Sequence, residues 1–187
     1  MRGFCELEKD GLHFQKKSIL NIVAVNNNMR ESLKSGFSFG TTSGIITTLG
    51  LIVGLNAGTR SALAVLGGIL SIAVADGLSE STAMHISKKS ESKRLSYIWE
   101  STFATLIAKF IVTMTFVLPI ISAELQTAVW IDIVWGLSLL CVLTYFVSEY
   151  KKEERWKDIL EHLLIAIFVI IATYYLGEWI HATISLY

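Results

Sequence analysis

Five long apolar stretches constrain this chain more than any other feature of its sequence. A helix that spans a membrane needs about 20 mostly apolar residues, at roughly 1.5 Å of rise per residue. Stretches of this length lie at residues 37–55, 61–84, 98–121, 126–148 and 159–180. The mean hydropathy of +0.54 exceeds what a soluble domain of 187 residues requires. We therefore predict an all-α, polytopic membrane protein with five transmembrane helices.

Basic residues are confined to alternate connections between these stretches. They are Arg2, Lys9, Lys16, Lys17, Arg30 and Lys34 near the N-terminus, Lys88, Lys89, Lys93 and Arg94 in the second connection, and Lys151, Lys152, Arg155 and Lys157 in the fourth. The remaining connections and the C-terminal tail hold only Arg60. Because cytoplasmic loops are enriched in Lys and Arg, we predict a cytoplasmic N-terminus and a C-terminus outside. We expect a multi-pass protein of a prokaryotic plasma membrane rather than an organelle membrane.

The domain organisation follows from the five stretches. Residues 1–35 mix apolar and basic side chains and predict a cytoplasmic tail with an interfacial helix, and residues 36–187 form one transmembrane domain. The formal net charge of zero argues against a nucleic-acid partner. Phosphate-binding, zinc-protease and nucleophile-elbow motifs are missing from the sequence, so we expect neither an enzyme nor a permanently bound cofactor.

Small residues recur every fourth position in the first two stretches. Such ladders let helix backbones approach closely in lipid, where close packing takes the place of the hydrophobic effect. We therefore expect the first two helices to form the tightly packed centre of the molecule. The residues predicted to pack in this way are Gly40, Gly44, Gly50, Gly54, Gly67, Ser71 and Ala75.

Charged residues inside the second stretch are candidates for a cation site. A charge in a membrane-spanning helix costs about 3 kcal/mol on insertion scales, so each retained charge suggests function. Asp76 and Glu80 lie one turn apart, and Met84 and His85 continue the row toward the cytoplasm. Carboxylate, thioether and imidazole are ligands for divalent transition metals. By helical rise, Ser43 lies near the depth of Asp76 and Glu100 near that of Glu80, so both extend the candidate metal and transport site.

Lys109 occupies the centre of the third stretch and must have an anionic partner there. Asp76 and Asp132 both lie within about one and a half turns of its depth. A pair of Lys109 with Asp76 would neutralise the charges without any metal. Alternatively, Lys109 competes with a substrate cation for Asp76, or exchanges a proton with it, and so couples transport to protonation.

Residues 40–55 and 67–79 resemble the first hairpin of the vacuolar iron transporter family, which includes nodulin-like membrane proteins. The resemblance implies five spans, a homodimer with its pore around the first span, and export of Fe²⁺ or Mn²⁺ from the cytoplasm against protons. The family pattern Ser-Met-Ala-x-Gly-Glu aligns with residues 71–76, which puts its carboxylate on Asp76. Ser43 stands where the family has an acidic residue, and residues 85–97 replace its Glu-rich metal-binding domain.

The predicted function is therefore export of a divalent cation, Fe²⁺ or Mn²⁺, by a proton-coupled homodimer in the lipid bilayer. One alternative is a non-transporting scaffold or sensor in which Asp76, Lys109 and Asp132 form a buried network. Another alternative is a transporter for a different solute.

Overall fold

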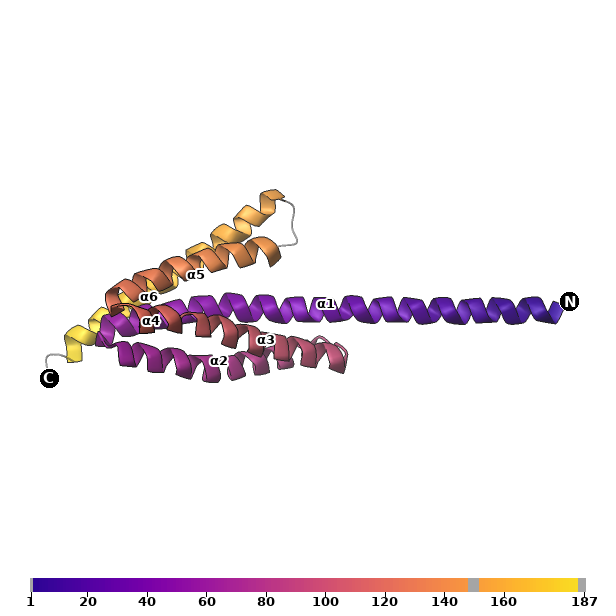
Figure 1. The fold of residues 1–187 in the computed structure, drawn as a ribbon, viewed down its shortest axis with the longest axis horizontal. Coiled ribbons are helices and arrows are strands. Elements are labelled where there is room, and N and C mark those ends of the chain that lie inside the picture. The colour runs from indigo at the N-terminus through magenta and orange to yellow at the C-terminus, as the bar shows by residue number, and fades with distance from the viewer. Residues whose placement is uncertain (1, 148–151, 185–187) are drawn as a thin grey trace.

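The computed structural model describes the backbone of residues 2–147 and 152–184, and the side chains of residues 31–146 and 156–184. Its helices are α1 (Arg2–Thr59), α2 (Ala62–Ser90), α3 (Leu95–Thr115), α4 (Val117–Ser122), α5 (Leu125–Val147) and α6 (Lys152–Ile184). Figure 1 shows their arrangement. The predicted cytoplasmic tail with an interfacial helix falls almost wholly outside the described side chains and stays a prediction.

In the part of the chain that the structure describes, five segments are long and apolar enough to cross a membrane, as predicted. They are Glu31–Thr59, Ala62–Ser90, Leu95–Ser122, Leu125–Phe146 and Trp156–Ile184. Large apolar side chains stand exposed on the outside of the bundle, among them Leu70, Val74 and Leu78 on α2. A surface of this kind is stable in lipid rather than in water. The chain is therefore a multi-pass integral membrane protein with an all-α fold.

The third span is built from two helices because of Pro119. Proline has no backbone N–H, and its ring clashes with the carbonyl four residues earlier, here that of Thr115. α3 ends at Thr115, and the Phe116 N–H instead bonds the Thr113 carbonyl at 3.2 Å. α4 then completes the crossing as far as Ser122.

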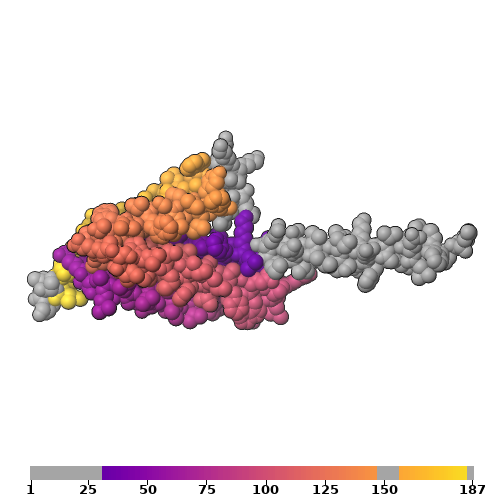
Figure 2. Space-filling view, viewed as in Figure 1, coloured from indigo at the N-terminus to yellow at the C-terminus, as the bar shows by residue number. Residues whose placement is uncertain are grey.

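The span of α1 is the centre of the bundle, and in Figure 2 other helices cover most of it. Gly40 lies so close to α3 that a Cβ there would collide with the Thr105 carbonyl oxygen. Further along the helix, a Cβ on Gly50 would meet Val169 of α6 at 2.7 Å. The predicted glycine ladders of α1 thus pack against α3 and α6.

The second helix does not share this central position, so the expectation of a central first hairpin is wrong for α2. Gly67 has nothing within 4 Å of an added Cβ, and Ser71 and Ala75 are exposed. Within the chain, the small residues of α1 pack against other helices, whereas this row on α2 faces outward. A packing role for Gly67, Ser71 and Ala75 requires a surface outside this chain and stays a prediction.

The two ends of the bundle differ in sequence and in packing. We call the end with the α2–α3 turn the basic end, because that turn carries Lys88, Lys89, Lys93 and Arg94. The α1–α2 and α4–α5 turns lie at the opposite end. In Figure 1 the α5–α6 pair splays away from α1 toward the basic end. An apolar core around Leu49, Ile52 and Phe116 joins the helices in the other half.

Candidate functional site

Lys109 lies at the middle of the bundle with its side chain fully buried. Its Nζ forms ion pairs with the Asp76 carboxylate and with Glu80 Oε1, the latter at 2.6 Å. It also lies 3.4 Å from Ser43 Oγ, and Ser43 donates a hydrogen bond to Glu80. These four side chains, Ser43, Asp76, Glu80 and Lys109, form what we call the ionic cluster. It joins α1, α2 and α3.

Local sequence explains why the ionic cluster can form. Asp76 and Glu80 are four residues apart, so both carboxylates leave the same face of α2. Gly44 of α1 opposes Lys109, and a Cβ at Gly44 would lie 3.3 Å from Lys109 Cγ. The absence of a side chain at Gly44 therefore lets the lysine stem pass close to α1.

The ionic cluster has an excess of negative charge when all its groups are ionised. Two carboxylates face one ammonium, which leaves one net negative charge in the membrane-spanning region. The side chains of Asp76 and Glu80 keep 29% and 18% of their surface exposed, whereas that of Lys109 has none. Because an unpaired buried charge is costly, Lys109 requires these carboxylates, while the carboxylates retain capacity for a further cation or proton.

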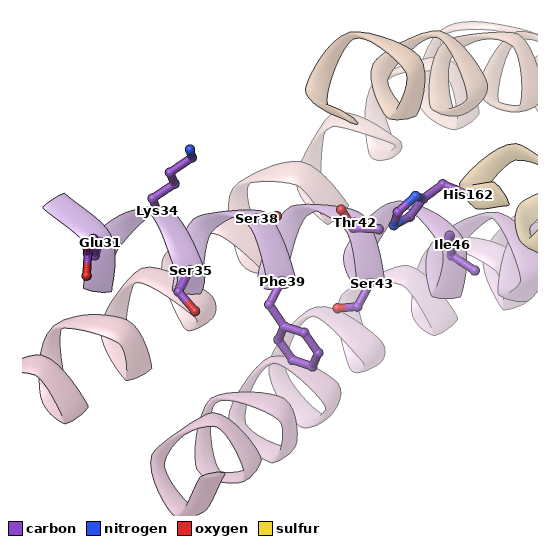
Figure 3. A pocket seen from close by; sticks show the side chains of 9 residues that line it. All are labelled: Glu31, Lys34, Ser35, Ser38, Phe39, Thr42, Ser43, Ile46 and His162. Carbon is purple, nitrogen blue, oxygen red and sulfur yellow. The ribbon is translucent and has the colours of Figure 1, made fainter. Parts of the chain in front are cut away.

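A cavity of about 600 Å³ opens beside the ionic cluster between α1 and α6. Along α1 it is lined by polar side chains, among them Ser38, Thr42 and Ser43, and by the apolar Phe39 and Ile46, and His162 contributes from α6 (Figure 3). Most of the lining surface is apolar. Glu31 begins the span at the basic end, so the cavity extends from that end toward the ionic cluster. Ser43 belongs to both the cavity wall and the ionic cluster.

Beyond the ionic cluster, toward the opposite end, the packing becomes dry. Thr48 and Thr113 are fully buried and bond each other, with their hydroxyl oxygens 3.2 Å apart. Next along α1 come Leu49 and Ile52, which are also fully buried. The described structure is thus open from the basic end and closed toward the other.

The predicted cytoplasmic extension of the metal site does not assemble. Met84 is buried, with 8% exposure, and His85 lies 3.3 Å from Thr102 Oγ1 and edge-on to the Trp99 ring. Glu100 instead accepts a hydrogen bond from Ser32 of α1. Across the described side chains, no group of three or more His, Cys, Asp or Glu residues could hold a metal ion.

Asp132, the second predicted partner of Lys109, lies elsewhere. It is fully buried on α5, and neither carboxylate oxygen has a hydrogen-bond partner among the described residues. The contact that is present joins Lys109 to Asp76, one of the two partners predicted from depth. Sequence reasoning missed that Glu80 also binds Lys109, although the four-residue spacing of the two carboxylates was a usable signal.

No protein-family model, curated protein or solved structure matches this chain. The fold and the ionic cluster define a polytopic α-helical membrane protein with a buried lysine held by two carboxylates.

Proposed function

We propose that this chain is a membrane transporter that exports a divalent cation, Fe²⁺ or Mn²⁺, from the cytoplasm in exchange for protons. One observation carries the proposal: a charged centre in the middle of the membrane-spanning region borders a cavity, lined in part by hydroxyl groups and by His162, that extends to one end of the bundle. A cavity that reaches an intramembrane charge is the arrangement expected for a substrate pathway.

Charge balance supports exchange of a divalent cation for a proton. With Lys109 protonated, the two carboxylates leave one negative charge uncompensated. Release of the lysine proton leaves a centre with two negative charges, which matches a divalent cation. In this scheme Asp76, Glu80 and Ser43 supply oxygen ligands, and oxygen ligands suit Mn²⁺. Lys109 takes a proton again when the metal ion leaves, so the centre is never left with two unpaired carboxylates.

The orientation and assembly belong to the same proposal. The basic end faces the cytoplasm by the positive-inside rule, so the cavity receives the ion from that side. We propose a homodimer in which the exposed row of Gly67, Ser71 and Ala75 on α2 meets the same row of a second copy. Small residues permit such close contact between helices in lipid.

Transport in proteoliposomes tests the proposal. Uptake of Mn²⁺ and Fe²⁺ is measured with and without an imposed pH gradient, for the wild type and for Asp76→Asn and Glu80→Gln. We expect uptake that depends on the gradient in the wild type and is lost in both variants. Glu91→Gln removes a carboxylate outside the spans and should transport normally. Folded wild-type protein that moves neither ion would overturn the proposal.

The second candidate function is a non-transporting scaffold, and the full engagement of Lys109 by two carboxylates favours it. In a scaffold, the triple variant Asp76→Asn, Glu80→Gln, Lys109→Met should keep the free energy of unfolding of the wild type, since no charge remains unpaired. In a transporter, the same variant should fold but lose all flux. All three groups must be changed, because Asp76→Asn with Lys109→Met would leave Glu80 alone.

A further inference from the structure

Asp132 is a buried acidic residue that does not belong to the ionic cluster. It lies on α5 seven residues after Leu125, which places it about 10 Å from the opposite end of the bundle by helical rise. Its side chain is fully buried, and both carboxylate oxygens are without a hydrogen-bond partner in the described part of the chain. An acidic group in this setting requires an explanation.

Among the described residues, the helix segments packed around Asp132 offer it no cation. α1, α4 and α6 pack against α5, and α3 touches it where Trp135 Nε1 bonds Thr115 Oγ1 at 3.2 Å. No charged side chain occurs in α4, in α1 from residue 45 to 59, or in α6 from residue 163 to 177. Tyr174 and Tyr175, the titratable residues of that α6 segment, are 45% and 68% exposed. On α3, Lys109 is already bound to Asp76 and Glu80.

The flanking residues of α5 reinforce this apolar setting. Ala128 and Val129, one turn away on the same helix, belong to the buried apolar core. One turn in the other direction, a Cβ on Gly136 would lie 2.8 Å from Leu49 of α1, so the two helices are in close contact there. An ionised carboxylate cannot be retained at such a place without a partner, whereas a neutral carboxylic acid can.

We propose that Asp132 is a proton-binding site, separate from the ionic cluster, and that it holds its proton at neutral pH. The ligand is the proton itself. It binds a carboxylate that is buried among apolar side chains and has no cationic partner among the described residues. A protonated side chain keeps α5 neutral against α1. Deprotonation requires that α5 separate from α1 far enough to admit water or a cation.

This assignment does not depend on transport, but its place in a transport cycle rests on the proposed function. The ionic cluster and Asp132 then lie at different depths, with the cluster reached from the basic end and Asp132 in the closed half. A conformational change that opens the closed half would expose Asp132 and let it exchange its proton with that side. Asp132 would thus report opening toward the opposite end.

Infrared spectroscopy of the full chain in lipid vesicles tests the site directly. The carboxylic-acid C=O stretch is distinct from the carboxylate bands, and carbon-13 at the aspartate side-chain carboxyl identifies the four aspartates of the sequence. At neutral pH we expect one isotope-shifted acid band in the wild type, its retention in Asp76→Asn, and its loss in Asp132→Asn. An Asp132→Glu variant, which keeps a carboxyl, covers the case in which Asp132→Asn does not fold. It should lose the aspartate-labelled band and gain an unlabelled acid band.

Each outcome decides the proposal without reference to flux. A wild type with no aspartate acid band at neutral pH would show Asp132 to be ionised and would overturn it. A band that survives in both Asp132 variants would assign the proton to another aspartate and would also overturn it. If the band behaves as expected while the wild type moves no metal ion, the proton site stands and the transport proposal falls.

Discussion

The two halves of the α1 span both pack closely through glycines, but the surroundings of these glycines differ. Near the basic end, Gly40 and Gly44 bring α3 close to α1, and neighbouring α1 side chains such as Ser38 and Thr42 line the cavity. Toward the opposite end, Gly50 and Gly54 face α6, where an added Cβ would lie 2.7 Å from Val169 and 3.3 Å from Thr173, and the surrounding side chains form an apolar core. Close packing alone therefore does not distinguish a structural region from a functional one.

The difference between the halves lies in what surrounds the close contact. In the half near the basic end, α6 contributes His162 to a cavity wall rather than packing against α1. In the other half, α6 covers the α1 backbone directly. The divergence of the α5–α6 pair thus opens one half and leaves the other closed. A transporter that alternates between its two sides needs this asymmetry in each of its states.

The largest expected contrast is in access to the two halves. In a background with Cys5→Ser and Cys141→Ala, a membrane-impermeant maleimide is applied from the basic end to Thr42→Cys and, separately, to Thr48→Cys. Thr42 lines the cavity, whereas Thr48 is fully buried. Exposing Thr48 requires local opening, and a cost of about 3 kcal/mol would slow its labelling about a hundredfold. Equal labelling rates would contradict the open and closed halves.

Removal of the buried cation should have the next largest effect. Lys109→Met leaves Asp76 and Glu80 without their common partner, and breaking a buried ion pair in this way costs about 3–5 kcal/mol. The free energy of unfolding in mixed detergent micelles measures the loss. Adding Asp76→Asn and Glu80→Gln should restore most of it. An unchanged unfolding midpoint in Lys109→Met would mean that the ionic cluster does not stabilise the bundle.

A matched pair of glycine variants separates packing inside the chain from packing outside it. Gly40→Ala forces a Cβ against the Thr105 carbonyl, and overpacking of this kind costs about 1–3 kcal/mol. Gly67→Ala adds the same atom where nothing lies within 4 Å and should not destabilise the monomer. The same unfolding assay compares them in detergent. Equal losses would place Gly67 in an interface that persists under those conditions.

The smallest effect is expected at the ion pair outside the membrane. Glu91 lies just after α2, and a hydrogen bond from Lys88, assisted by the charges of Lys88 and Lys93, lowers the pKa of its carboxyl. A lowered pKa gives stability that is present above the ordinary carboxyl range and lost as the pH falls through the pKa of the folded state. Because Glu91 is solvated, Glu91→Gln should leave the unfolding midpoint nearly unchanged at any pH. A large shift at neutral pH would contradict this assignment.

Sequence reasoning succeeded where depth alone decides the answer. The length of the apolar stretches located the five spans. Helical rise gave two candidate partners for Lys109, and one of them, Asp76, binds it in the structure. Depth does not give the direction in which a side chain leaves its helix. The hydrogen bonds from Ser43 to Glu80 and from Ser32 to Glu100 therefore could not be foreseen. Both depend on how the helices are rotated about their axes.

The cavity and the isolation of Asp132 could not be predicted for a different reason. Both depend on how the α5–α6 pair sits against α1, which is a property of packing between distant parts of the chain. Depth made Lys109 and Asp132 plausible partners, but the described structure assigns both nearby carboxylates of α2 to Lys109 and leaves Asp132 in an apolar setting. Hydropathy shows that a helix crosses the membrane, not which neighbour it meets.

Binding of Mn²⁺ to the purified protein, with the released protons counted in weakly buffered solution, tests the central claim most directly. Exchange of the lysine proton for a divalent cation predicts release of one proton per bound Mn²⁺, with binding lost in both Asp76→Asn and Glu80→Gln. Absence of Mn²⁺ binding, or binding that survives both substitutions, would contradict a cation centre at the ionic cluster.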